Sequence, residues 1–359
     1  MILLNPGPVT LSARVRAALQ KDDLCHREAE FATLSLGLRT SLETLYDATE
    51  HLAVLLTGSG SCAVEAMLAT FAPREAATLV ISNGVYGERM ALMLDCQGKP
   101  FFESRQAWGT ALDLTAVSQL LDAHADIACV AVVHHETTTG RLNDLDELAA
   151  LCSNRNVGLL IDAVSSFGGE RIDFHRWRPL AVAATANKCL HGIPGVAFVL
   201  GRRDFLATPR GNSPSLYLDL ERYVDLQRDG WSPFTQSVQG YYALDEALRE
   251  LDEQGGWQRR RERYQQITDR LRGVLADLGV RAFLDRQSSA SMLTVYHLPP
   301  GCSYPELHTG LKQAGFTIYA GQGQLASRVF RIATMGDLGD ADVERCCEVF
   351  QSLLGQSAI

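Results

Sequence analysis

The feature that most constrains the fold is a regular alternation of apolar runs and helix-like segments between residues 77 and 186. The apolar runs are nearly continuous in Val, Ile, Leu and Ala, as strands buried on both faces of a sheet are. The helix-like segments lie at 85–98 and 142–156. This order is typical of an α/β fold in which helices cover both faces of the sheet. The strands are predicted at 77–83, 127–135, 157–164 and 180–186.

The C-terminal part has a different pattern. A long amphipathic stretch, 240–278, contains the basic run Arg259–Arg263, which we expect to be a solvated helix face. Because 359 residues have room for about two domains, we predict an N-terminal arm at 1–15, a large domain at 16–258 and a smaller α+β domain at 259–359. The small domain is predicted to contain strands at 291–298, 316–321 and 328–334 and helices at 305–315 and 340–354.

Charge and cysteine content narrow the class of protein. A net charge of −9 disfavours nucleic acid or an anionic membrane as a partner. No apolar run approaches the roughly 20 residues of a membrane span, and the N-terminus lacks the basic and apolar regions of a leader peptide. The nine cysteines form no C-x-x-C pair, so we expect free thiols in a reducing cytoplasm.

Lys188 is placed differently from the other three lysines, Lys21, Lys99 and Lys312, which have polar neighbours or glycine nearby. It lies between two apolar runs, 180–186 and 196–200. A partly buried lysine can lose its proton and act as a nucleophile or base, which arginine cannot do. The alternative is an ordinary lysine in a loop between strands.

A glycine- and serine-rich turn, Gly58–Ser61, lies between an apolar segment and a helix-like run. Glycines allow the backbone to approach an anion, and the free N–H groups of a helix start point toward it. No lysine follows the glycines, as a P-loop requires, and the third glycine of a dinucleotide fingerprint is missing. A plain helix N-cap remains the alternative to a phosphate site.

Asp162 lies at the C-terminal end of the predicted strand at 157–164, at the edge where open α/β sheets bind ligands. An acid there can be an N-cap, a metal ligand or the partner of a protonated heteroaromatic nitrogen. No second acid or histidine stands at metal-ligand spacing, so we expect no metal. A phosphate cup, a lysine that forms a Schiff base and an acid for a pyridine nitrogen are the three requirements of pyridoxal phosphate.

The chain resembles the fold-type I pyridoxal-phosphate aminotransferases of the alanine–glyoxylate and serine–pyruvate group, and within it the 2-aminoethylphosphonate–pyruvate transaminases. The resemblance implies a large domain with a mostly parallel sheet and a smaller C-terminal α+β domain. It runs nearly end to end and is carried by LLNPGPVTLS, DLCHREAEF, LLTGSGSCAVEA, SNGVYGERM, HHETTTGRLN, IDAVSSFGG, ATANKCLHGIPGVAFVL and FRIATMGDL.

Position by position, the resemblance implies roles for ten residues. Lys188 would form the Schiff base and Asp162 would hold the pyridine nitrogen. Arg331 would bind the acid group of the substrate, although a surface ion pair is the commoner role of an arginine. The remaining cofactor contacts would be Ser59, Gly60 and Ser61 at the phosphate, Tyr86 stacked on the ring, Thr138 touching the ring, Asn187 near the phosphate, and Thr235 reaching the phosphate of a partner subunit in a homodimer.

Tyr86 could instead be a turn residue that packs on the sheet edge, and Thr138 could satisfy turn backbone. Gln236 stands next to Thr235, where relatives usually have proline. His26 and Arg27 match a family signature without an assigned role. The resemblance implies transfer of an amino group from a small amino-phosphonate to pyruvate. The alternatives are an alanine–glyoxylate or serine–pyruvate transaminase, or a regulator that binds the cofactor without turnover.

Overall fold

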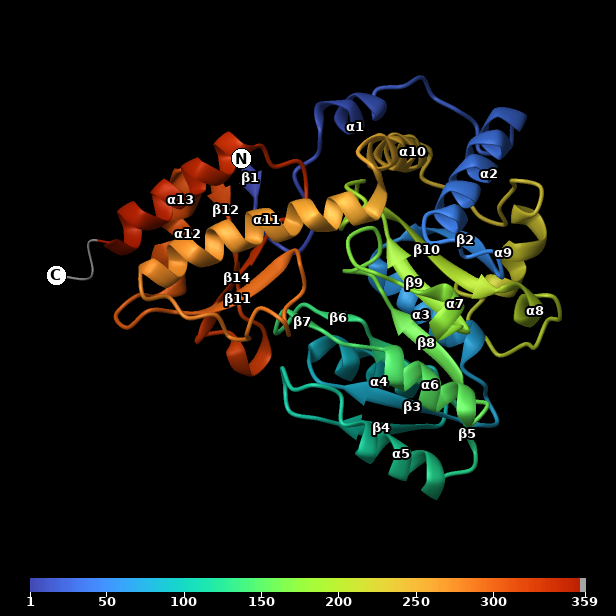
Figure 1. The fold of residues 1–359 in the computed structure, drawn as a ribbon. Coiled ribbons are helices and arrows are strands. Elements are labelled where there is room, and N and C mark those ends of the chain that lie inside the picture. The colour runs from blue at the N-terminus through green and yellow to red at the C-terminus, as the bar shows by residue number, and fades with distance from the viewer. Residues whose placement is uncertain (356–359) are drawn as a thin grey trace.

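A seven-stranded sheet forms the centre of the large domain in the computed structural model, which describes residues 1–355 (Figure 1). Its spatial order is β2-β10-β9-β8-β5-β3-β4. Strand β10 runs antiparallel to β2 and β9, and the other neighbours pair in parallel. The fold class inferred from the sequence is confirmed. The strands are β2 (His51–Gly58), β3 (Ala77–Ser82), β4 (Phe101–Arg105), β5 (Ile127–Val133), β8 (Gly158–Asp162), β9 (Ala181–Thr185) and β10 (Gly195–Arg202).

Helices cover both faces of this sheet, because alternate residues of each strand are apolar in both directions. In β10, Phe198 and Leu200 belong to one core cluster, whereas Ala197 and Val199 belong to the other. The first face is covered by α2 (Ala29–Thr44), α5 (Leu114–Ala123), α6 (Asp146–Asn154), α7 (Phe174–Trp177) and α10 (Val238–Glu253). The second is covered by α3 (Gly60–Phe71), α4 (Val85–Cys96), α8 (Arg203–Leu206) and α9 (Leu220–Gln227).

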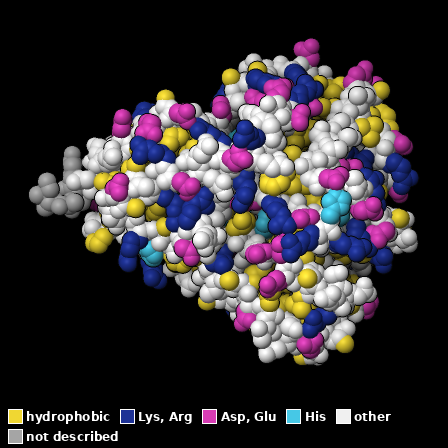
Figure 2. All heavy atoms as spheres, viewed as in Figure 1, with side chains coloured by type: hydrophobic (Ala, Val, Ile, Leu, Met, Phe, Trp, Pro, Cys, Tyr) yellow, Lys and Arg dark blue, Asp and Glu magenta, His cyan; other side chains and the backbone are white. Residues whose placement is uncertain are grey.

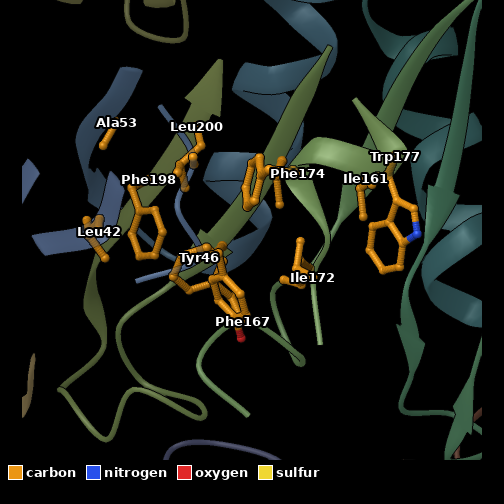
Figure 3. Close-up of a cluster of buried hydrophobic side chains, with 14 of the residues drawn as sticks. Leu42, Tyr46, Ala53, Ile161, Phe167, Ile172, Phe174, Trp177, Phe198 and Leu200 are labelled. Atoms are coloured by element: carbon orange, nitrogen blue, oxygen red, sulfur yellow. The ribbon is translucent and has the colours of Figure 1, made fainter. Parts of the chain in front are cut away.

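Several aromatic side chains lie among the aliphatic residues of the first core cluster (Figure 3). Tyr46 lies edge-on to Phe167, with ring centroids 5.0 Å apart, and stacks on Trp257 at 5.2 Å. Its hydroxyl donates to the carbonyl oxygen of Glu170 at 2.6 Å and accepts from the backbone N–H of Gly168 at 2.9 Å. The core thereby fixes the segment that follows Asp162.

The smaller domain contains a three-stranded antiparallel sheet of order β11-β14-β13. The N-terminal strand β1 pairs in parallel with β12 of this domain. The stretch predicted as one strand at 316–321 is therefore two strands in different sheets. The elements are β1 (Ile2–Leu3), β11 (Leu293–His297), β12 (Phe316–Thr317), β13 (Tyr319–Ala320), β14 (Val329–Ala333), α12 (Tyr304–Gln313), η1 (Gly323–Leu325) and α13 (Asp340–Leu354).

The amphipathic stretch 240–278 is two helices, α10 and α11 (Gly256–Asp277), and α11 runs from the large domain along the small one (Figure 1). Gly255 separates them with φ = +94°, a left-handed conformation that glycine adopts without strain. The boundary predicted between residues 258 and 259 falls in the first turn of α11. A short helix, α1 (Ala13–Ala18), packs on α10, and a hairpin is formed by β6 (His135–Glu136) and β7 (Arg141–Leu142).

On the face shown in Figure 2, basic and acidic side chains lie among one another. One exposed ion pair joins Arg270 of α11 to Glu344 of α13, with an N–O distance of 2.6 Å. Exposed pairs of this kind contribute little to stability, so folding rests on the apolar cores of both domains. Within residues 1–355, every helix is too short or too polar to cross a membrane.

Candidate active site

Five parallel strands end at the same edge of the sheet, and each leads into a residue that the sequence predicted for the site. Strand β2 leads to Ser59, β3 to Tyr86, β5 to Thr138, β8 ends at Asp162, and β9 leads to Lys188. Strands β8 and β9 are neighbours, with Asp162 opposite Ala183. Residues spread over more than a hundred positions of the chain are thereby gathered at one sheet edge, where open α/β sheets bind ligands.

The α3 N-terminus provides donors for an anion at this edge. Ser59 is the N-cap residue, is exposed, and makes no side-chain cap bond, so its hydroxyl is available. Gly60 is buried, and a Cβ there would lie 2.6 Å from Cγ1 of Val164. Glycine is therefore required for α3 to approach the loop after β8. The free N–H groups of the first turn, with the hydroxyl of Ser61, form a site suited to phosphate.

Asp162 is buried, and its Oδ1 accepts a hydrogen bond from the backbone N–H of Val164 at 2.9 Å. Burial raises the pKa of Asp162 to about 6, and the positive charges of Lys188 and Arg89 limit the rise. A positively charged group beside this buried carboxyl would lower its pKa again, because the positive charge stabilises the ionised carboxylate.

Lys188 lies in the turn after β9, and its Nζ donates to the carbonyl oxygen of Pro6. Burial lowers its pKa, because desolvation disfavours the ammonium form. The N-terminal turn packs directly on the lysine side chain: a Cβ on Gly7 would lie 2.7 Å from Cδ of Lys188. The N-terminal arm therefore forms one wall of the site.

Helix α11 fixes the loop that follows Lys188. Nη1 of Arg260 donates to the carbonyl oxygens of Cys189 and Leu190, at 2.9 and 3.3 Å. The prediction that Arg259–Arg263 form a solvated face is wrong for Arg260, which is buried. Arg261 is partly exposed, and it pairs with the buried Glu170 at 2.8 Å. Amphipathic spacing could not reveal that this face of the helix packs on polar backbone.

Glu136 is a buried residue of the site that sequence reasoning missed. Its carboxylate accepts backbone N–H bonds from Tyr86 at 3.1 Å, Gly87 at 3.4 Å and Thr138 at 3.1 Å. It holds the start of α4 and, with it, Tyr86. Burial raises its pKa to about 7. Its position after a buried strand, like that of Asp162, is the signal that could have identified it.

The hydroxyl of Thr138 accepts from the backbone N–H of Val85 at 3.3 Å, so Thr138 also contacts the start of α4. Oδ1 of Asn187 accepts from the Thr185 hydroxyl at 2.9 Å. Thr138 is buried, whereas Asn187 and Tyr86 are partly exposed toward the site edge. The Tyr86 side chain borders the same cavity as Asp162.

Thr235 is exposed, and no contact joins it to the α3 N-terminus within the described chain. Its neighbour Gln236 is buried and fully bonded: Oε1 accepts from the hydroxyls of Thr57 and Tyr241, and Nε2 donates to Ser232. Gln236 thus ties this loop to β2 where proline was expected. The adjoining Ser232 carbonyl accepts from Arg27 at 3.3 Å, so Arg27 supports the same loop.

Arg331 of β14 is buried and reaches from the small domain to the large one. Its Nε donates to the carbonyl of Ala320 at 2.8 Å, and its Nη1 donates to the carbonyl of Thr137 and to Oε1 of Gln322, both at 3.2 Å. Among residues 1–355 it makes no ion pair, and its guanidinium also interacts with the Tyr86 side chain. The expectation of a surface ion pair does not hold.

These residues fit pyridoxal phosphate. The α3 N-terminus offers hydrogen-bond donors for a phosphate, and Asp162 offers a buried acid for a ring nitrogen. Lys188 offers an amine that donates to the carbonyl oxygen of Pro6. A cavity lined by Gly60, Ser61, Tyr86 and Asp162 connects the phosphate and acid positions. The donor set matches the three requirements of the cofactor.

Comparison with known proteins assigns the family. The family model described as aminotransferase class-V matches residues 14–333. The 2-aminoethylphosphonate–pyruvate transaminase of Aeromonas hydrophila is 38% identical over 96% of this chain and 92% of that protein. The enzyme of the same name from Pseudomonas fluorescens is 34% identical over 100% of this chain and 98% of that protein.

Solved structures agree in fold. The alanine–glyoxylate aminotransferase from Nostoc sp. has a TM-score of 0.92 at 25% identity, covering 98% of this chain and 95% of that one. The aspartate aminotransferase of subgroup IV from Thermus thermophilus has a TM-score of 0.90 at 26% identity, covering 99% of both chains. The chain therefore belongs to the class-V aminotransferases of fold type I, and its cofactor is pyridoxal phosphate.

Proposed function

We propose that the enzyme transfers the amino group of 2-aminoethylphosphonate to pyruvate and releases phosphonoacetaldehyde and alanine. The names of the relatives that match nearly the whole chain support this substrate pair. The observation that carries the proposal is Arg331, a buried guanidinium without a carboxylate partner among the described residues. A buried charge without a partner is costly, so an anionic substrate group would complete the site.

One arginine can serve both halves of the reaction. Protein oxygens hold Nε and Nη1 of Arg331, which fixes the plane of the guanidinium. Guanidinium donates to tetrahedral phosphonate and planar carboxylate oxygens alike. The same side chain would therefore bind the phosphonate of the donor and the carboxylate of pyruvate.

Two residues would carry the proton chemistry. When bound, pyridoxal phosphate supplies the carbon that accepts the amino group and a ring that takes up the electrons of the broken C–H bond. Lys188 would accept the proton from the amine-bearing carbon on its Nζ. The lowered pKa of Lys188 favours the neutral amine that this step requires. Asp162 would keep a negative charge beside the ring nitrogen.

We also propose a homodimer in the cytoplasm. Thr235 is exposed on a loop held by Gln236, as expected of a residue that serves a site on a second subunit. All nine cysteines are free, which supports a reducing compartment. Sedimentation of the cofactor-loaded protein should give twice the chain mass of 39.3 kDa.

The substrate proposal is tested by half-reactions. The cofactor-loaded enzyme would be mixed in single turnover with 2-aminoethylphosphonate, alanine or serine, and loss of the visible cofactor band would be followed. The aminated enzyme would then be mixed with pyruvate or glyoxylate. We expect 2-aminoethylphosphonate and pyruvate to react with the highest kcat/KM. Faster reaction of serine, or of alanine with glyoxylate, would refute the substrate assignment, and absence of turnover with all donors would favour a cofactor-binding regulator.

A further inference from the structure

Arg89 of α4 faces the cavity at the α3 N-terminus and has no role in the function described so far. It lines the cavity together with Gly60, Ser61, Tyr86 and Asp162. Its Nη1 donates to the Ser61 hydroxyl at 3.4 Å, and its guanidinium carbon lies 4.7 Å from the centroid of the Tyr86 ring. Tyr86 therefore holds the guanidinium in place beside the serine.

The cavity contains two positive features, and Asp162 is the one carboxyl group among its lining residues. The N-terminus of α3 carries a partial positive charge, and Arg89 adds a full one. Among residues 1–355, no carboxylate lies within ion-pair distance of Arg89. Against the larger effect of burial, the positive charge of Arg89 nevertheless lowers the pKa of Asp162. One Asp162 oxygen already accepts from Val164. Two positive groups that converge on a partly buried cavity imply an anion between them.

Two anionic groups need a place in this active site, and Arg331 already accounts for the acid group of the substrate. The other is the phosphate of the cofactor, which the proposed function places at Ser59–Ser61. The turn has no lysine of its own, so any cation beside the phosphate comes from elsewhere in the fold. We propose that Arg89 supplies it: its guanidinium donates to the cofactor phosphate opposite the backbone N–H groups of α3.

The placement explains why an arginine stands one turn after Tyr86. Residues 86 and 89 are on the same side of α4, so the ring and the guanidinium lie side by side. Glu136 holds the first turn of that helix through the backbone N–H of Tyr86. The ring-stacking residue and the phosphate cation are thus positioned by one element. This inference rests on the proposed location of the phosphate.

The test compares pyridoxal phosphate with pyridoxal, which lacks only the phosphate group. Equilibrium affinities of both would be measured on cofactor-free protein by quenching of tryptophan fluorescence, for wild type, Arg89→Met and Arg89→Lys. Methionine keeps the bulk over Tyr86 without the charge. We expect Arg89→Met to weaken pyridoxal phosphate binding about 10- to 100-fold, the loss typical of a charge-assisted hydrogen bond, and to leave pyridoxal affinity within about twofold. Arg89→Lys should recover part of the loss.

Arg270→Ala, which removes a surface ion pair in the small domain, serves as the control and should behave as wild type. An equal loss of affinity for pyridoxal would show that Arg89 acts through the packing of Tyr86 and would overturn the proposal. Unchanged cofactor affinity with a raised KM for 2-aminoethylphosphonate would make Arg89 a substrate residue, which also overturns it. If wild type itself failed to distinguish the two compounds, the phosphate site at Ser59–Ser61 would be wrong.

Discussion

At the scale of single residues, the buried Lys99 and the partly buried Lys188 show that burial alone does not identify the reactive lysine. Nζ of Lys99 donates to the carbonyl oxygens of Leu68, Ala69 and Ala72 at 2.9, 2.6 and 2.5 Å, where α3 ends. This lysine satisfies a helix C-terminus, and burial lowers its pKa to about 8. Nζ of Lys188, in contrast, donates to the carbonyl oxygen of Pro6 at the edge of the site. The sequence singled out Lys188 by its position after a strand; the burial of Lys99 could not be predicted, because its partners are backbone atoms.

We predict that Lys188 is the covalent attachment residue. Borohydride reduction of the cofactor-loaded protein, followed by peptide mass analysis, should place a pyridoxyl group on the Lys188 peptide and leave Lys99 unmodified. Lys188→Arg should abolish turnover while keeping the positive charge, because guanidinium is neither nucleophile nor base at neutral pH. A pyridoxyl group on Lys21, Lys99 or Lys312 would contradict the assignment.

Asp162→Asn is expected to stabilise the cofactor-free protein while it impairs catalysis. The folded pKa of Asp162 is about 6, above the model-peptide value of 3.8. The folded state therefore binds more protons between these values, so the free energy of unfolding falls as pH rises from about 4 to 6 and stays low above. Above about pH 6 the buried carboxylate lowers the free energy of unfolding by on the order of 2–3 kcal/mol. Asparagine has no charge to bury, so this loss of stability disappears in the variant.

Thermal unfolding of both cofactor-free proteins at pH 7.5 checks the stability, with Asp162→Asn expected to melt higher. In the loaded enzyme the proton-transfer half-reaction should slow by roughly 10²-fold or more, as preorganised charge is lost. A variant that is less stable without cofactor would show that the carboxylate contributes net favourable bonds. Near-normal half-reaction rates would remove Asp162 from the mechanism.

At the scale of elements, the sheet could be predicted and the N-terminal turn could not. Apolar runs located β3, β5, β8 and β9 to within a few residues, because buried parallel strands have a strong local signal. The turn at Pro6–Gly7 contacts Lys188, which lies 182 positions further along the chain. The local sequence around either residue contains no pattern from which such a contact could be predicted. The small domain anchors the turn: Leu4 accepts from the backbone N–H of Ala333 at 2.8 Å.

We predict that Gly7→Ala misplaces Lys188. Gly7 has φ = +107°, and a Cβ there would overlap the lysine side chain. Gly315→Ala is the matched control: its φ is +92°, also positive, but a Cβ there would meet only Nη1 of Arg345, at 3.4 Å. Both variants carry backbone strain of about 1–3 kcal/mol, so the difference between them isolates the clash. Attachment of the cofactor to Lys188, followed by absorbance, should slow about tenfold or more in Gly7→Ala alone. Equal rates in the two variants would refute this role.

At the scale of the whole molecule, the active site is complete only where the domains meet. Arg331 of β14 donates to the Thr137 carbonyl of the large domain, and Arg261 of α11 pairs with the buried Glu170. Contacts between domains depend on tertiary packing, so spacing along the chain could not predict them. The resemblance to a family placed Arg331 in the site; nothing in the stretch RVFRIAT distinguishes it from a surface arginine.

The prediction at this scale is that Arg331 binds the acid group of both substrates across the domain interface. Arg331→Ala should lower kcat/KM for 2-aminoethylphosphonate and for pyruvate alike, because each loses a charge-assisted contact of ~2–5 kcal/mol. Arg331→Lys should restore only part of this, since an ammonium lacks the planar, fixed geometry that the Ala320 and Thr137 carbonyls impose on the guanidinium. The visible spectrum of the bound cofactor should stay unchanged, because the contacts of Lys188 and Asp162 remain. Arg328→Ala, an exposed position just before the same strand, should leave both half-reactions unaffected. If Arg331→Ala impaired only one half-reaction, a second anion anchor would serve the other substrate, and a single shared site would be ruled out.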